Sequence, residues 1–208
     1  MTPKGHSPVD LDPAAPATSR RGLIGALGAV GLAGAAALSI ARPASAAPTS
    51  PTDGDKELLR QAMQLELTAE ALYRTALAAG LSDVGAELAT VFAENHAAYA
   101  SEIAGAAGFS ADTRNEEVFE LLESAFDTSN GGAFAEAAHG LENTATATHT
   151  SLMPEYESVN ARKITASIIV VEARMATVLS DFGGLAGGFD GLFEPDAEAL
   201  ELVEGAAS

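Results

Sequence analysis

A glutamate lies in the middle of an aliphatic run in the last quarter of the chain. Glu172 is part of SIIVVEARMATVL, residues 167–179, where four aliphatic residues precede it and Met175 and Leu179 follow it at helical spacing. A carboxylate in such surroundings has lost its hydration, so it must take up a proton, accept a hydrogen bond or bind a cation. Other polar residues that face inward therefore decide its chemistry.

Four further ionisable residues project toward apolar stripes when the helical segments are advanced by about 100° per residue. Glu66 is the inward acid of the first segment, and His96 flanks the apolar face of the second. Glu142 and His149 are seven residues apart in the third segment, so they lie on nearly the same helix edge, two turns apart. Together with Glu172, they form the set of candidate metal ligands.

The basic residues of these segments lie on the faces directed away from the apolar stripes. They are Arg60, Arg74, Arg162, Lys163 and Arg174. We therefore expect no cation on an inner face, and three buried carboxylates without a basic partner would cost several kcal/mol per ion. Either raised pKa values keep them protonated, or a metal ion holds them ionised. Carboxylates combined with imidazole suit iron, manganese or zinc better than copper(I) or calcium.

Apolar residues spaced three and four apart predict the elements that position these side chains. Four long helices are expected, and a shorter crossover helix over residues 115–126 joins the second to the third. The long helices cover residues 55–79, 82–107, a third segment opened by SNGG at 129–132, and 160–182. Pro154 should kink or interrupt the third, because proline lacks the amide donor. On the second, Val84 and Val91 are placed on the inner stripe.

Sustained alternation of apolar and polar residues, which would indicate strands, is absent from the sequence. The expected fold is therefore an all-α four-helix bundle with a short crossover helix between the second and third long helices.

The N-terminal region has the pattern of an export signal. SRRGLI at 19–24 matches the twin-arginine motif, an apolar run follows to Ile40, and Ala44-Ser45-Ala46 is a cleavage site of the A-x-A type. An uncleaved membrane anchor is the alternative, but the run consists mainly of weakly apolar glycine and alanine. The sequence thus predicts an exported, extracytoplasmic protein. Its expected parts are a signal peptide (1–46), a linker (47–54), the bundle (55–182) and a Gly-rich, acidic C-terminal tail (183–208).

Charge and cysteine content exclude several functions. The 208 residues include 11 basic and 29 acidic side chains, a net charge of −18 at pH 7. Such a chain is not expected to bind nucleic acid or an anionic membrane surface after its signal is removed. It has no cysteine, so it has no disulfide, thiolate metal site or cysteine nucleophile. A homodimer is compatible with the sequence.

The chain resembles the ferritin-like superfamily, in particular exported bacterial ferritin-like domain proteins, over about residues 55–182. The similarity rests on one motif in each long helix: LELTAEALYRTAL, FAENHAAYASEIAGAAG, LENTATATH and SIIVVEARMATVL. Di-iron members of that superfamily carry a glutamate on each of two helices and Glu-x-x-His on each of the other two.

The resemblance implies only part of that ligand set here. Glu66 and Glu142 match the two single glutamates. His96 stands in the second-helix motif, but Ala93 takes the place of its glutamate, and Glu172 stands in the fourth, but Met175 takes the place of its histidine. A complete dinuclear site is therefore not implied.

Two functions remain open on the sequence. In one, a single iron or manganese ion is held by Glu66, His96 and Glu172. Glu142 is then a second anion near the ion, and His149 is a substitute ligand from an unusual position. Redox chemistry such as ferroxidase or peroxide-scavenging activity would follow, with Tyr73, Tyr99 and Tyr156 facing inward to hydrogen-bond the carboxylates. In the other, the protein is a metal-free bundle serving as a structural, stress or interaction module. No catalytic residue and no organic cofactor are predicted.

Overall fold

Five α-helices and one short 3-10 helix make up the computed structural model, which describes residues 46–126, 128–185 and 197–202. In chain order the elements are α1 (Asp53–Ala78), α2 (Asp83–Ala107), α3 (Glu116–Glu123), α4 (Gly131–Leu152), the 3-10 helix η1 (Met153–Glu155) and α5 (Val159–Gly183). The described residues contain no strand, and α3 is the short helix between the second and third long ones. The predicted all-α bundle is confirmed.

Most of the predicted signal peptide, residues 1–45, lies outside the described residues, as do residues 186–196 and 203–208 of the predicted tail. In the part of the chain that the structure describes, no helix is both long and apolar enough to cross a membrane.

Local sequence signals account for the helix ends. Thr52 and Asp55 form a capping box at the start of α1, in which each side chain accepts a hydrogen bond from the other's backbone amide. Gly108 ends α2 in the left-handed conformation, at a φ of 80°, which glycine adopts without a steric penalty. Ser82 occupies the N-cap position of α2, but its hydroxyl donates to Asp83 and caps no amide.

Pro154 separates α4 from α5, as predicted. The chain tightens into η1 at this proline and turns back within a few residues. Asp55, which is buried at the start of α1, closes this corner, because its Oδ1 accepts from the Glu157 amide at 2.7 Å and its Oδ2 from the Ser158 amide at 3.0 Å. One carboxylate thereby joins the beginnings of α1 and α5.

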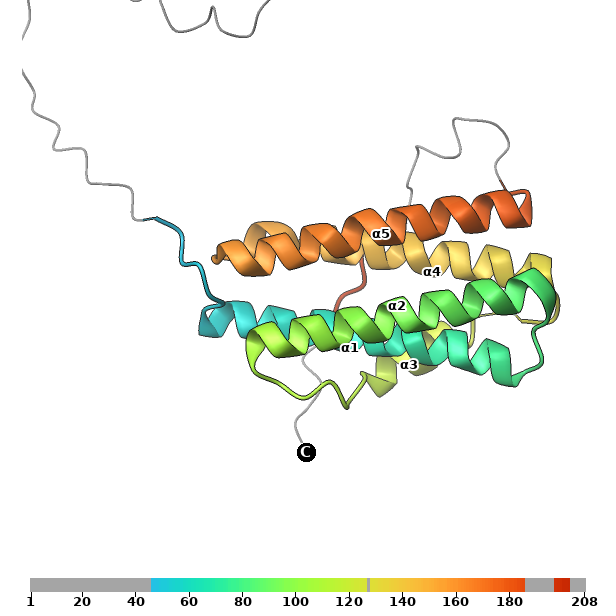
Figure 1. Cartoon of the computed structure of the whole chain (residues 1–208), viewed down its shortest axis with the longest axis horizontal. Coiled ribbons are helices and arrows are strands. Elements are labelled where there is room, and N and C mark those ends of the chain that lie inside the picture. The colour runs from blue at the N-terminus through green and yellow to red at the C-terminus, as the bar shows by residue number, and fades with distance from the viewer. Residues whose placement is uncertain (1–45, 127, 186–196, 203–208) are drawn as a thin grey trace, which may run out of the picture. The chain divides into compact units, whose positions relative to one another are not determined.

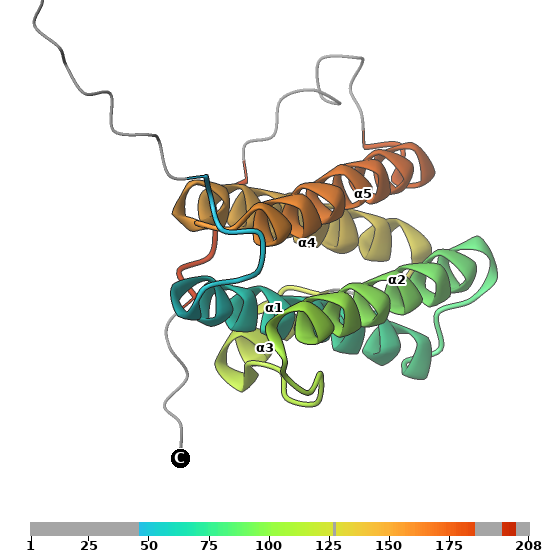
Figure 2. The same ribbon diagram turned by 60° about the vertical axis from the view of Figure 1, so that its left-hand side comes forward.

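The long helices pair into two hairpins. α1 packs along α2 and α4 packs along α5, whereas contacts between the two pairs are much sparser. Both views show the α1–α2 hairpin beside the α4–α5 hairpin, with α3 against α1 (Figure 1, Figure 2). Side chains that project from both hairpins must therefore fill the space between them.

Two apolar clusters fill the two ends of this space. The first draws on the C-terminal half of α1 and the N-terminal half of α4 and includes Leu72, Phe92, Phe134, Met175 and Leu179. The second lies toward the opposite end and includes Leu59, Ile103, Tyr156 and Ile168. Between them lies a layer of buried polar residues.

The prediction for Val84 and Val91 was wrong. Their side chains are 53% and 51% exposed, on the outward side of α2. The buried stripe of α2 consists largely of small residues such as Ala89, Ala93 and Ala100, which let α1 and α2 approach closely. Valine is more hydrophobic than alanine, so the apolar pattern of α2 taken alone places the valines on the inner face instead of the alanines.

The described part of the C-terminal tail, residues 197–202, contacts the bundle. It has no regular secondary structure. The amide of Leu200 donates to the hydroxyl of buried Thr148 on α4 at 2.9 Å. In both views this dark red segment leaves α4 and runs toward α1 (Figure 1, Figure 2). This part of the tail is therefore more closely attached to the bundle than its glycine-rich neighbourhood suggests.

Candidate metal centre

Six side chains form the polar layer between the two apolar clusters, and each hairpin contributes three. They are Glu66 and Tyr73 from α1, His96 from α2, Glu142 and His149 from α4, and Glu172 from α5. None is more than 1% exposed. Because bulk water cannot solvate them, their charges must be balanced within the layer.

Glu66 lies at the centre of this layer and binds both histidines. Its Oε2 is 2.7 Å from Nδ1 of His96, and its Oε1 is 2.6 Å from Nε2 of His149. Burial acts to raise the pKa of Glu66, but the hydrogen bonds from His149 and His96 outweigh it and lower the pKa to about 2. Glu66 is therefore an ionised carboxylate, and each of its two oxygens pairs with one imidazole.

His96 lies between two carboxylates. Its Nε2 is 3.1 Å from Oε1 of Glu142, on the other side of the ring from Glu66. Burial opposes a charge on His96, but Glu142 and Glu66 together hold its pKa well above the usual 6.5. The hydroxyl of Tyr73 also donates to Oε1 of Glu142, and burial and the charge of Glu142 raise the tyrosine pKa so that it keeps this proton.

Glu172 is the least satisfied member of the layer. Neither of its oxygens has a hydrogen-bond partner among the described residues, and its nearest ionic neighbour is Nε2 of His149, 3.4 Å from Oε1. Burial raises its pKa to about 7; His149 opposes this shift, and the negative charges of Glu66 and Glu142 add to it. Burial also opposes a charge on His149, but attraction to Glu172 and Glu66 raises its pKa to about 10.

These contacts correct the expectation that no cation faces the carboxylates. No lysine or arginine in the described ranges is buried, as the wheel predicted. However, His96 and His149 are themselves held in their protonated forms by the acids around them. In the absence of a metal, the two histidines act as the counter-cations of the buried carboxylates.

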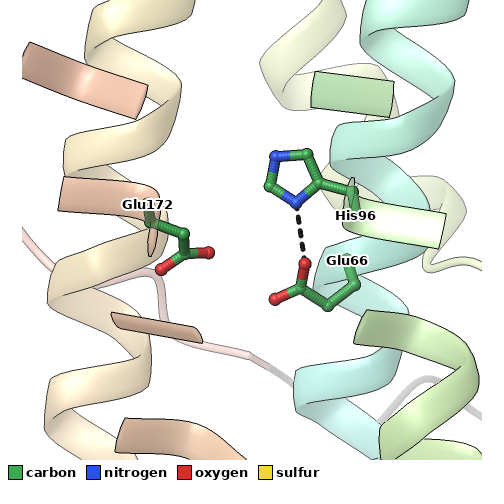
Figure 3. Close-up of side chains that lie close together, drawn as sticks. All are labelled: Glu66, His96 and Glu172. Carbon is green, nitrogen blue, oxygen red and sulfur yellow. Dashed lines mark hydrogen bonds and ion pairs between the residues drawn. The ribbon is translucent and has the colours of Figure 1, made fainter. Parts of the chain in front are cut away.

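The residues of the layer fit a metal ion. Donor atoms of Glu66, His96 and Glu172 all lie within 4.8 Å of one another, and the three side chains converge from three helices (Figure 3). The unpartnered oxygens of Glu172 are what a cation would satisfy. Two carboxylates and one imidazole form a donor set suited to iron, manganese or zinc.

The structure brings all five predicted candidate ligands into this layer, although it groups only three of them around a common point. Glu142 and His149 adjoin the group without belonging to it. Whether any of the five binds a metal stays a prediction. Of the three tyrosines expected to face inward, Tyr73 reaches a carboxylate, whereas Tyr156 is buried in the second apolar cluster and Tyr99 is only partly buried.

Comparison with known families agrees with this architecture. A family profile described as ferritin-like domain matches residues 54–184, which include α2, α4 and α5, all of α1 but its first residue, and every residue of the polar layer. The chain therefore belongs to the ferritin-like domain family. No curated protein and no solved structure matched it.

Proposed function

We propose that this ferritin-like protein binds one divalent iron or manganese ion through Glu66, His96 and Glu172. The observation that carries the proposal is the convergence of these three buried donors, one of which, Glu172, has two unpartnered oxygens. A buried carboxylate that lacks a hydrogen-bond donor is costly unless it is protonated or binds a cation. A metal ion would hold Glu172 ionised and relieve the repulsion between it and Glu66.

A bound iron or manganese ion would supply one-electron redox chemistry of the ferroxidase or peroxide-scavenging kind. This reaction class is proposed by analogy with the family. The protein's part is to hold two carboxylates and one imidazole at fixed positions and to exclude bulk water with the apolar clusters on either side.

A metal-free bundle with a structural, stress or interaction role is the second candidate. It is favoured by the hydrogen bonds that already satisfy both oxygens of Glu66 and both nitrogens of His96. In addition, Ala93 and Met175, at two positions where the family's motifs have ligands, are buried and carry no metal-binding oxygen or nitrogen in their side chains. In this state, the protons of the two histidines would balance the carboxylates.

Elemental analysis of the mature protein separates the two candidates. The protein is purified without chelator, reconstituted anaerobically with Fe²⁺ or Mn²⁺, and compared with Glu172→Gln. Glu94→Gln is the matched control, because Glu94 is an exposed acid on α2. We expect about one metal ion per chain in the wild type and the control, and almost none in Glu172→Gln. Absence of metal from the reconstituted wild type would favour the metal-free bundle.

We also propose that the chain is exported by the twin-arginine pathway. Support comes from SRRGLI at 19–24, the following apolar run and the A-x-A site that ends at Ala46. Replacing both Arg20 and Arg21 with lysine should retain the full-length precursor inside the cell, whereas the wild type should be recovered outside the cytoplasm in a shortened form. Equal export of both proteins would refute the proposed pathway.

A further inference from the structure

The two nitrogens of His96 face different carboxylates on opposite sides of the ring. Nδ1 faces Glu66, which belongs to the group of converging donors, whereas Nε2 faces Glu142, which does not. A metal ion held with Glu66 and Glu172 would therefore use Nδ1, and the Nε2 proton would remain directed at Glu142.

Glu142 is held in this position by a second donor. The Tyr73 hydroxyl and His96 Nε2 both approach its Oε1, whereas its Oε2 is buried without a hydrogen-bond partner among the described residues, and Glu142 does not belong to the group of converging donors. The Tyr73 ring also stacks on the His96 ring, with centroids 5.7 Å apart and an interplanar angle of 16°. The phenol thus fixes the carboxylate and restricts the imidazole plane at the same time.

His149 provides a contrast within the same layer. Its Nε2 faces Glu66 and Glu172, but its Nδ1 is buried without a hydrogen-bond partner among the described residues. Histidines that bind metals almost always donate their other N–H to a carboxylate, a carbonyl or water, which fixes the tautomer and the ring orientation. His96 has such a partner and His149 does not.

We infer that Glu142 and Tyr73 are positioning residues that hold His96 in the tautomer and orientation needed to bind the metal, and that Glu142 is not itself a ligand. This inference rests on the proposed function, since it assigns roles around the same metal. It differs from the role that the family resemblance implies for Glu142, in which the glutamate of the third long helix is a ligand. The Tyr73–Glu142–His96 arrangement is the second layer of interactions that supports a metal-bound histidine.

The test uses Co²⁺ as the probe, because its visible absorption reports the ligand set while titration gives the stoichiometry and the affinity. The mature wild type is compared with Glu142→Gln, Tyr73→Phe and the ligand variant Glu172→Gln. We expect Glu142→Gln and Tyr73→Phe to bind one Co²⁺ per chain with the wild-type spectrum but about 10- to 100-fold more weakly. Glu172→Gln should lose the site or change its spectrum.

A core variant distinguishes positioning from general destabilisation. Leu59→Ala, in the second apolar cluster, should lower the free energy of unfolding and leave both the Co²⁺ affinity and the spectrum unchanged. If Glu142→Gln fails to fold, Tyr73→Phe still tests the inference, because it removes one donor and leaves the carboxylate in place.

Different results overturn the inference and the proposed function. If the wild type binds Co²⁺ and Glu142→Gln loses it or changes its spectrum as Glu172→Gln does, Glu142 is a ligand and the inference alone is wrong. If Glu142→Gln or Tyr73→Phe binds Co²⁺ as tightly as the wild type, the positioning role is refuted. If the wild type binds no Co²⁺, Fe²⁺ or Mn²⁺, the proposed function fails and the inference fails with it.

Discussion

Replacing Glu172 with glutamine should remove a pH dependence from the stability of the metal-free protein. Burial raises the pKa of Glu172 from 4.5 to about 7, against the opposing effect of His149 and with a contribution from the charges of Glu66 and Glu142. The folded protein thus keeps a proton on Glu172 over a pH range in which the unfolded chain has released it. The stability that this proton contributes is complete below about pH 4.5 and is lost as the pH rises through about 7.

The size of the effect follows from the pKa difference. At about 1.4 kcal/mol per pKa unit, the shift of Glu172 corresponds to about 3 kcal/mol, of which roughly 2–3 kcal/mol falls between pH 5 and pH 8. The residue is fully buried, so solvent does not screen the interaction. Glutamine has nearly the same shape and no proton to lose.

Urea unfolding in the presence of a chelator, at pH 5 and pH 8, measures this contribution. The free energy of unfolding of Glu172→Gln, measured relative to the wild type, should be roughly 2–3 kcal/mol higher at pH 8 than at pH 5. Groups outside the polar layer titrate in both proteins and cancel in this comparison. His149 does not cancel, because Glu172 raises its pKa; its contribution has the same sign, since the wild type also loses the stability that the His149 proton contributes as the pH rises above 6.5. Glu94→Gln should follow the wild type at both pH values. An equal difference between wild type and Glu172→Gln at pH 5 and pH 8 would refute the assignment of a raised pKa to Glu172.

Two further predictions concern parts of the fold that position the polar layer. Asp55→Ala should lower the free energy of unfolding by roughly 2–4 kcal/mol, because three backbone amides lose their charged acceptor. Asp53→Ala is the control in the same urea titration: Asp53 is exposed in the same helix turn, so its loss should leave the free energy of unfolding unchanged. Gly140→Ala should stabilise α4 by about 0.5–1 kcal/mol because its added Cβ meets open space. Gly183→Ala should destabilise α5 by about 1–3 kcal/mol, because its Cβ would lie 2.8 Å from that of Ala135; equal melting temperatures for the two glycine variants would contradict this.

Apolar periodicity was sufficient to predict the fold class. Helix period, glycine stops and Pro154 are local signals, and the four long helices and the interruption at Pro154 follow from them. The same reasoning failed for Val84 and Val91, because burial in α2 depends on how closely α1 approaches and not on the hydrophobicity of α2 alone.

The content of the polar layer was predictable, but its pairing was not. A helical wheel shows that Glu66, His96 and Glu172 point inward, since this depends on one helix at a time. It does not show that Nε2 of His96 meets Glu142, because that contact depends on the relative height and rotation of two hairpins. The burial of Asp55 was missed for the same reason, since its partners lie 102 and 103 residues further along the chain.

The polar layer also determines how the two hairpins are aligned along their length. Sliding one hairpin past the other by a helical turn, about 5.4 Å, would move large side chains such as Leu72 and Phe134 away from their partners in the apolar clusters. The same slide would separate Glu66 from His149 and leave buried charges without partners, at a cost of several kcal/mol. The hydrogen bonds of the polar layer therefore act with the two apolar clusters to select one register, and they do so without a bound metal ion.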